Sequence, residues 1–371
     1  MGLPQGALGI EHGAKRREGR PQRLRLRHGG RTVIRLTRSV VVTDHPWPAI
    51  EPEQQVLARA GAKLTLAPAA TESQLIECVV EADAILTCFA RVTAPILEAA
   101  PRLTVVGRYG IGVDNIDVEA ATRLGILVTN VPSYCEDEVA EHALGLILAL
   151  ARGLVDFDRG IRMDDWSLTQ VVPPLRRIRG RTLGIVGVGR IGRLLARKAQ
   201  GLGLDVIGCR SNDAEAGSDS DAVEIVSLRD IARRADFVSL HVPLRPDTRH
   251  LIDERFLRAM KPSAFLINTA RGEVIDQRAL VAALRENWIA GAGLDVLDTE
   301  RVAREDPLLA QRNVIVTPHV AYYSEESLLE LGRLAAENVA SVLTGHVPAS
   351  VVNSEVLALD RWRKLRRGRG T

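Results

Sequence analysis

Three polar side chains stand at or beyond the ends of apolar runs that are typical of buried strands. They are Arg271 in NTARGEVID, Glu300 in GLDVLDTE and His319 in VTPHVAYYS. In open α/β sheets, ligands bind beyond the carboxyl ends of the strands, so side chains in these places can converge on one ligand. An arginine binds anions, and a histidine beside a carboxylate exchanges protons near neutral pH. Each residue alone could also be a surface charge or a capping residue.

A second chemical signal is the glycine turn in TLGIVGVGRIGRLLARK. Gly187, Gly189 and Gly192 form GxGxxG between an apolar strand and a helix that opens with Arg190 and Ile191. The first glycine permits a tight turn, the second lets the backbone approach a pyrophosphate, and the third allows close helix packing. The helix N-terminus adds free N–H groups and a partial positive charge. The turn therefore predicts a dinucleotide site, with a glycine-rich turn that binds nothing as the alternative.

The strand after this turn ends in DVIGCRSND, where such units usually carry an acid that binds the ribose hydroxyls. Here that position holds Arg210, 18 residues beyond Gly192, and Ser211 follows it. A guanidinium can pair with a 2′-phosphate and stack on adenine. We therefore expect NADP(H) to be favoured over NAD(H). The alternative is a solvated arginine on a loop.

Two series of strands alternating with helices position these residues. The first begins at residue 39 and the second at Thr182, and both predict an α/β fold of doubly wound parallel sheets. Between them, residues 136–153 (EDEVAEHALGLILALARG) predict a long helix that is apolar nearly all round. Such a helix must be buried on several sides, at a domain junction or a subunit interface. We expect a homodimer that uses this helix, and a structural role for His142 within it.

Five ordered motifs, GVGRIG, LHVPLRPDTRHLID, NTARGEVIDQRALVAAL, AGAGLDV and VTPHVA, resemble the signatures of the D-isomer-specific 2-hydroxyacid dehydrogenases. The resemblance runs from about residue 39 to residue 352. It implies a flavodoxin-like substrate-binding domain and a Rossmann dinucleotide-binding domain. The expected boundaries are 39–133 with 320–352 for the substrate domain, 134–319 for the Rossmann domain, 1–38 for a disordered basic extension and 353–371 for a basic C-terminal tail.

By this resemblance, Arg271, Glu300 and His319 match the catalytic residues of the family. Arg271 would bind the carboxylate of a 2-keto acid and polarise its carbonyl. His319 would give the proton in reduction and take it in oxidation, while Glu300 would orient the imidazole and raise its pKa. Arg301 replaces the proline that many relatives carry after the glutamate, so Glu305 is the fallback.

The resemblance also assigns binding residues. Backbone N–H groups of Ile111 and Gly112 would cradle the substrate carboxylate, and Tyr322 would shape the pocket or else pack in the core. The expected dinucleotide contacts are Gly187, Gly189, Arg190, Ile191, Gly192, Arg210, Ser211, Pro243, Thr248, Thr269, Ala270 and Asp295, with Asp295 on the nicotinamide amide. His241 would be a structural hydrogen bonder.

The C-terminal motifs resemble the branch of the C-terminal-binding-protein corepressors and the glyoxylate and hydroxypyruvate reductases. The expected function is reversible hydride transfer between NADP(H), or NAD(H), and a small 2-keto or 2-hydroxy acid such as glyoxylate or hydroxypyruvate. The alternatives are phosphoglycerate dehydrogenase activity and a dinucleotide-sensing dimeric scaffold. The segment CFARVT (88–93) suits a small or apolar substituent better than a phosphate.

Composition limits the other classes of function. The chain of 371 residues carries a net charge of +3, but ten basic residues lie in 1–38 and six in 361–371, so the body between them is acidic. Nucleic-acid binding would have to rest on these ends and is not expected. Four cysteines without metal-ligand spacing predict free thiols, no metal and a reducing compartment. Without a signal peptide or a membrane-spanning run, we expect a cytoplasmic protein.

Overall fold

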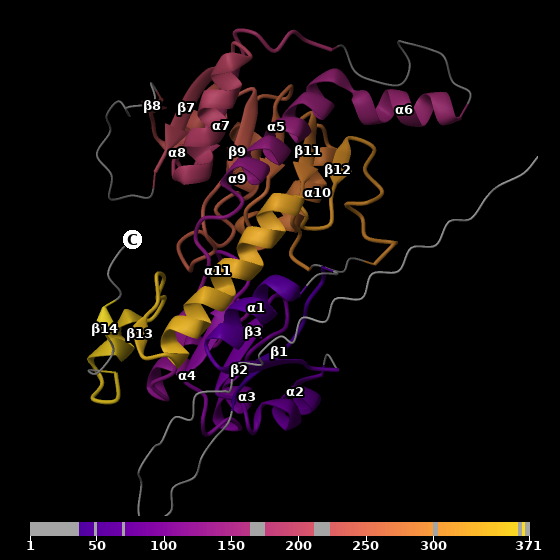
Figure 1. The fold of residues 1–371 in the computed structure, drawn as a ribbon. Coiled ribbons are helices and arrows are strands. Elements are labelled where there is room, and N and C mark those ends of the chain that lie inside the picture. Colours follow the sequence, from indigo (N-terminus) through magenta and orange to yellow (C-terminus); the bar gives the residue numbers. More distant parts are fainter. Residues whose placement is uncertain are drawn as a thin grey trace, which may run out of the picture.

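The structure of the chain is a computed structural model, and it describes residues 37–47, 50–68, 71–163, 175–210, 223–299, 303–362 and 366–367. Two parallel sheets with helices on both faces dominate it (Figure 1). We call the part around the five-stranded sheet the first lobe and the part around the seven-stranded sheet the second lobe.

The sheet of the first lobe has the order β2-β1-β3-β4-β5. Its strands are β1 (Arg38–Val42), β2 (Ala62–Leu66), β3 (Ala84–Thr87), β4 (Val105–Arg108) and β5 (Leu127–Thr129). One face packs against α1 (Glu51–Arg59) and α11 (Glu325–Leu343), and the other against α2 (Glu72–Val79), α3 (Ala94–Glu98) and α4 (Val118–Arg123). All pairs are parallel, which gives the predicted flavodoxin-like winding.

The sheet of the second lobe has the order β12-β11-β10-β9-β6-β7-β8, a Rossmann winding. Its strands are β6 (Thr182–Val186), β7 (Asp205–Cys209), β8 (Glu224–Ile225), β9 (Phe237–Leu240), β10 (Phe265–Asn268), β11 (Gly291–Leu294) and β12 (Val314–Val316). Its helices are α7 (Arg190–Gly201), α8 (Leu228–Arg234), α9 (Glu254–Ala259), α10 (Gln277–Arg285) and the 3₁₀ turn η1 (Gly272–Val274). The predicted fold class is therefore confirmed, although the short β8 was not predicted.

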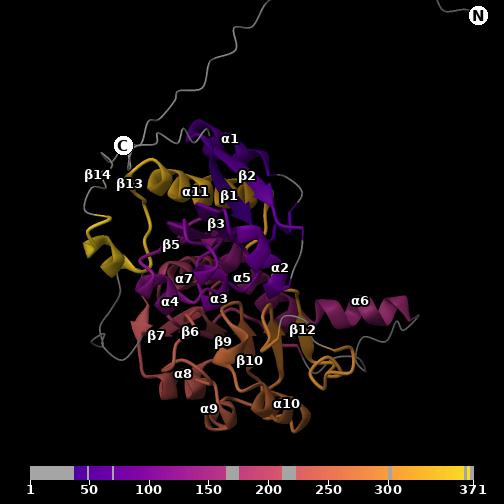
Figure 2. The same ribbon diagram turned by 90° about the horizontal axis from the view of Figure 1, so that it is seen from below.

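The long apolar helix is α5 (Glu136–Arg152), and Gly153 ends it with a left-handed φ of 61°. Its buried side chains pack against the second lobe, mainly α7, β10 and β11, so this chain itself covers much of the apolar surface. An unpredicted helix, α6 (Leu154–Arg162), follows at once and extends away from the body in both views (Figures 1 and 2).

The chain returns to the first lobe through α11, which packs beside α1 on one face of the sheet. Residues 353–362, which the sequence places in the basic tail, also pack there: Asn353 accepts a hydrogen bond from the N–H of Val128 at 2.8 Å, and Trp362 is buried. This segment holds η2 (Ser354–Ala358), and a small sheet pairs β13 (His346–Val347) with β14 (Arg366–Arg367). The expected extension over residues 1–38 lies outside the described residues except for its last two positions. No helix of the described ranges is long and apolar enough to cross a membrane.

Candidate active site between the two lobes

The glycine turn joins β6 to α7 at the carboxyl edge of the Rossmann sheet. Gly187 has φ 103°, and a Cβ there would lie 2.7 Å from the carbonyl oxygen of His241. A Cβ on Gly192 would lie 2.4 Å from the carbonyl oxygen of Gly187, whereas Gly189 faces open space. The packing of the chain itself thus requires Gly187 and Gly192. Gly189, between them, leaves room for a phosphate at the start of α7.

Arg210 lies beside this turn because β7 runs next to β6. The N–H of Gly187 donates to the carbonyl oxygen of Cys209 at 3.0 Å, so the residue that follows β7 stands next to the glycines. This is the place where a ribose would lie in such a unit. Ser211, the second predicted phosphate contact, lies outside the described residues.

The segments after β9 and β10 lie next to the glycine turn along the carboxyl edge of the Rossmann sheet. Pro243, Thr269 and Ala270 line a cavity there, and the hydroxyl of Thr269 is buried without a hydrogen-bond partner among the described residues. Thr248 does not line this cavity: it is buried, and its hydroxyl donates to the carbonyl oxygen of Pro243 at 2.6 Å. Thr248 therefore shapes the loop.

Arg271 follows β10, and its guanidinium has a fixed orientation. Its Nε donates to Asp114 Oδ2 at 2.7 Å and its Nη1 to the carbonyl oxygen of Ala270 at 2.8 Å. Its Nη2 lies against Gly112, where a Cβ would approach it to 1.7 Å. Asn268, which sequence reasoning missed, donates to the carbonyl oxygen of Arg271 at 2.8 Å and is fully buried. Arg271, which is predicted to bind the substrate carboxylate, thus contacts Gly112 of the other lobe, whose backbone is predicted to cradle the same carboxylate.

His319 follows β12 with φ 54°, a left-handed conformation that is uncommon outside glycine. Its imidazole makes edge contacts with the rings of Phe89 and Tyr322, at centroid distances of 5.7 and 6.3 Å. The carboxylate of Asp295 holds the following backbone: it accepts from the N–H groups of Val320 and Ala321, each at 2.9 Å. Asp295 therefore supports the turn that presents His319, a role that the sequence did not predict, and its contact with a nicotinamide amide stays a prediction.

These residues line one cavity of about 360 Å³ between the lobes. Besides Arg271 and His319, the predicted residues in its wall are Ile111, Gly112, Ile191, Pro243, Thr269, Ala270, Asp295 and Tyr322. The cavity reaches from Ile191 at the start of α7 to Arg108 at the carboxyl end of β4, while the glycines of the turn and Arg210 lie outside its wall. Within the described residues, no cluster of three or more His, Cys, Asp or Glu side chains has the arrangement of a metal site.

Comparison with known proteins agrees with this geometry. A family model, the NAD binding domain of the D-isomer specific 2-hydroxyacid dehydrogenases, matches residues 144–321. A glyoxylate reductase from Korarchaeum cryptofilum is 43% identical over 76% of this chain and 86% of its own length. The chain belongs to the D-isomer specific 2-hydroxyacid dehydrogenase family.

Two further members of this family are similar to the chain. A D-3-phosphoglycerate dehydrogenase from Methanocaldococcus jannaschii is 37% identical over 88% of this chain, which spans 62% of that relative. The structure of an NADPH-dependent glyoxylate/hydroxypyruvate reductase from Sinorhizobium meliloti, in complex with NADP and malonate, is 29% identical with a TM-score of 0.75, covering 89% of this chain and 99% of that one. The protein is thus an oxidoreductase that binds a nicotinamide dinucleotide and acts on a small 2-keto or 2-hydroxy acid.

In this dehydrogenase, sequence reasoning missed a second arginine of the cavity. Arg108 ends β4, is 8% exposed and lines the cavity, yet its Nε and Nη1 have no hydrogen-bond partner among the described residues. Buried charges are normally paired. The signal was the RYG of RYGIGVDN, where a charged residue ends an apolar strand, much as Arg271 follows one.

Burial perturbs the pKa values of three other titratable groups in the cavity wall. Burial raises the pKa of the Cys135 thiol to about 12 and that of the Tyr134 hydroxyl well above its ordinary value. Burial also lowers the pKa of His241 to about 4, so this imidazole is uncharged at neutral pH. His241 therefore cannot replace His319 as the acid. Glu300, the predicted partner of His319, lies outside the described residues.

Proposed function

We propose that this dehydrogenase reduces a small 2-keto acid such as glyoxylate or hydroxypyruvate and favours NADP(H). One observation carries the proposal: a cavity of about 360 Å³ has the cations of Arg271 and Arg108 and the imidazole of His319 in its wall. A 2-keto acid offers a carboxylate for the arginines and a carbonyl oxygen for the acid. The names of the two reductases described above support the same substrate class.

Arg271 binds the substrate carboxylate in this proposal. Asp114 and the carbonyl oxygen of Ala270 occupy its Nε and Nη1, which leaves Nη2 beside Gly112 for the substrate. A carboxylate there can also accept hydrogen bonds from the backbone N–H groups of Ile111 and Gly112. Charge-assisted bonds of this kind are about twice as strong as neutral ones.

His319 supplies the proton. When bound, the dinucleotide would supply the hydride. In reduction the carbonyl oxygen takes a proton from a ring nitrogen of His319, and in oxidation His319 takes this proton back. Glu300 orients the ring in this proposal and favours its protonated form, because a nearby negative charge raises the pKa of an imidazole. The rings of Phe89 and Tyr322 restrict the space around the imidazole.

The preference for NADP(H) rests on Arg210. An acid in this position would repel a 2′-phosphate, whereas the guanidinium next to the glycine turn attracts it. The matching family description names NAD and the Sinorhizobium meliloti structure holds NADP, so the residue at this position is the discriminating feature.

A substrate panel tests both parts of the proposal. We expect kcat/KM for glyoxylate or hydroxypyruvate to be highest with NADPH, and Arg210→Asp to shift the preference toward NADH. A tenfold or greater preference of the unchanged protein for NADH would refute the cofactor assignment. Higher kcat/KM for phosphohydroxypyruvate would favour the phosphoglycerate dehydrogenase alternative. If His319→Ala abolished turnover but cells that carry this variant behaved like cells with the unchanged protein, the result would favour the scaffold alternative.

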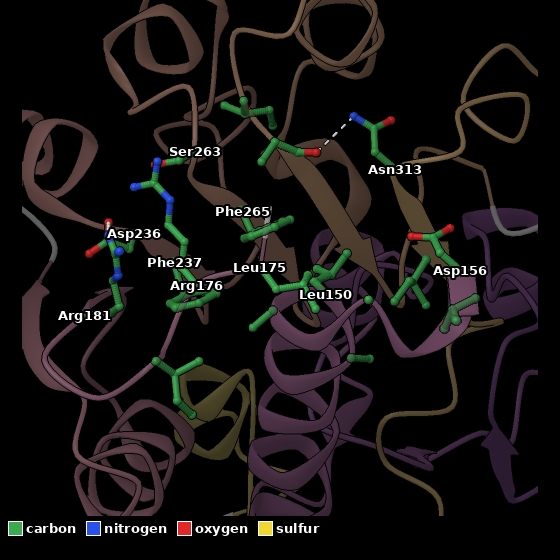
Figure 3. A pocket seen from close by; sticks show the side chains of 18 of the residues that line it. Leu150, Asp156, Leu175, Arg176, Arg181, Asp236, Phe237, Ser263, Phe265 and Asn313 are labelled. Atoms are coloured by element: carbon green, nitrogen blue, oxygen red, sulfur yellow. Dashed lines mark hydrogen bonds and ion pairs between the residues drawn. The ribbon is translucent and has the colours of Figure 1, made fainter. Parts of the chain in front are cut away.

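We propose that the dehydrogenase also forms a homodimer through a surface away from the active site. Near the amino edge of the Rossmann sheet lies a second cavity, of about 330 Å³, which we call the basal pocket (Figure 3). Its floor includes Leu150, Phe237 and Phe265, and Arg181 forms an ion pair with Asp236 at its rim. The pocket is mainly apolar and faces away from the active site.

Helix α6 begins at the basal pocket and presents apolar side chains to solvent. None of its residues is buried, Leu154 is 56% exposed and Ile161 is 46% exposed. In a two-fold dimer a surface patch meets itself, so each α6 can cover the basal pocket of the other copy. Such a dimer would bury both the exposed apolar side chains of α6 and the apolar basal pocket. This surface therefore complements the α5 helix as the proposed site of the homodimer.

Light scattering tests the dimer. We expect the unchanged protein to be dimeric, and Leu154→Glu with Ile161→Glu to make it monomeric with the circular dichroism spectrum retained. The control is Leu329→Glu on α11, which is 56% exposed on another face. A double variant that stays dimeric would exclude α6 from the interface.

A further inference from the structure

One face of α5 contacts the catalytic segment that follows β12. Glu138 accepts a hydrogen bond from the hydroxyl of Ser324 at 2.7 Å, and Val139 packs with Ala321. One turn further along the helix, Nε2 of His142 lies 2.9 Å from the hydroxyl oxygen of Thr317. The helix therefore contacts residues on both sides of His319.

The hydrogen bonds at Thr317 have a defined direction. Its hydroxyl lies 2.6 Å from Oδ1 of Asp295, and a carboxylate can only accept, so the single hydroxyl proton of Thr317 is used there. Nε2 of His142 must therefore donate to the oxygen of Thr317. The same Nε2 lies 3.6 Å from Asp295 Oδ1, so the N–H also points toward that negative charge.

Asp295 links the hydroxyl of Thr317 to the backbone that follows His319. Its carboxylate is fully buried and accepts from the N–H groups of Val320 and Ala321, while the N–H of His319 donates to the main-chain oxygen of Asp295 at 2.8 Å. A left-handed residue other than glycine costs of order 1 kcal/mol or more and persists only when its surroundings hold it. The hydrogen bonds of Asp295 hold the backbone on both sides of this left-handed residue.

We propose that His142 is a positioning residue for His319. Its Nε2–H, through Thr317 and Asp295, fixes the backbone turn that presents the catalytic imidazole to the substrate. The inference rests on the proposed role of His319 as the proton donor. It also replaces the purely structural role that the sequence predicted for His142.

A double-mutant cycle tests this inference on the purified full-length enzyme with glyoxylate and NADPH. His142→Leu removes the N–H donor. Thr317→Val removes the hydroxyl group that links His142 to Asp295, with little change of shape. We expect each to lower kcat about tenfold, which corresponds to about 1.4 kcal/mol, with KM for NADPH unchanged. Because both act through one chain of hydrogen bonds, the double variant should be no slower than either single variant.

Three controls separate positioning from packing. His142→Gln keeps an N–H donor and should recover most of the lost kcat, and Thr317→Ser should do the same. Gly145→Ala alters the same helix where a Cβ meets nothing within 4 Å, and it should leave kcat unchanged. Additive losses in the double variant would overturn the inference, as would equal losses for His142→Gln and His142→Leu, or no loss at all. If the unchanged enzyme reduced no 2-keto acid, the proposed function itself would fail, so the two failures are distinguishable.

Discussion

Replacing Arg108 with methionine should make the protein more stable and less active. Arg108 is 8% exposed, and two of its three guanidinium nitrogens have no partner among the described residues. Keeping an unpaired charge away from water costs several kcal/mol even after relaxation. Methionine fills a similar length of side chain without that cost, so the free energy of unfolding should rise by about 1–3 kcal/mol.

The same substitution removes a cation from the wall of the substrate cavity. A charge-assisted hydrogen bond contributes about 1.5–3 kcal/mol, so kcat/KM for a 2-keto acid should fall by roughly 10- to 150-fold. Differential scanning calorimetry without substrate, and steady-state kinetics with glyoxylate, measure the two effects. The control is Arg123→Met, at a side chain 59% exposed and 3.6 Å from Glu98, which should change neither quantity.

The two effects must occur together for the reasoning to hold. If Arg108→Met lowered the melting temperature and left kcat/KM unchanged, the guanidinium would be a structural element with bonds of its own. If the melting temperature rose and kcat/KM stayed the same, Arg108 would not contact the substrate. Either result would refute the proposed role of this cation.

The glycine turn and His241 support further predictions. Gly192→Ala should unfold at a lower temperature, because its Cβ would lie 2.4 Å from a backbone oxygen, whereas Gly189→Ala should keep its melting temperature and bind NADPH at least tenfold more weakly, as measured by fluorescence titration. Equal melting temperatures for the two variants would contradict this distinction. Because burial lowers the pKa of His241 from 6.5 to about 4, the unfolded chain takes up this proton first as pH falls. The contribution of neutral His241 to the free energy of unfolding is complete above about pH 6.5. It falls by on the order of 3 kcal/mol as the pH decreases to about 4. Urea unfolding should show a shallower decline over this window in His241→Asn; an identical decline would exclude His241 as its source.

The α/β fold could be predicted because its determinants are local. Most strands of the two sheets are short apolar runs between turn residues, and each main helix has an apolar repeat, so both predicted series of strands were found. The GxGxxG turn could be read in the same way, since the requirements at Gly187 and Gly192 concern residues a few positions apart. The two-residue β8 and helix α6 were missed, because the first is too short for a pattern and the second has no buried face in this chain.

The tertiary structure alone decided how the site is supported. Sequence order could bring Arg271 and His319 to one edge, but it could not show that Asp114, from the other lobe, orients the guanidinium. It assigned Asp295 to a ligand, but it could not show that this carboxylate also holds the backbone that follows His319. The donor role of His142 depends on Thr317, and the orientation of Arg271 depends on Asp114; both pairs lie more than 150 residues apart in the chain. The sequence by itself determines which residues can do chemistry; contacts between distant segments decide which of them face the substrate and which hold the others in place.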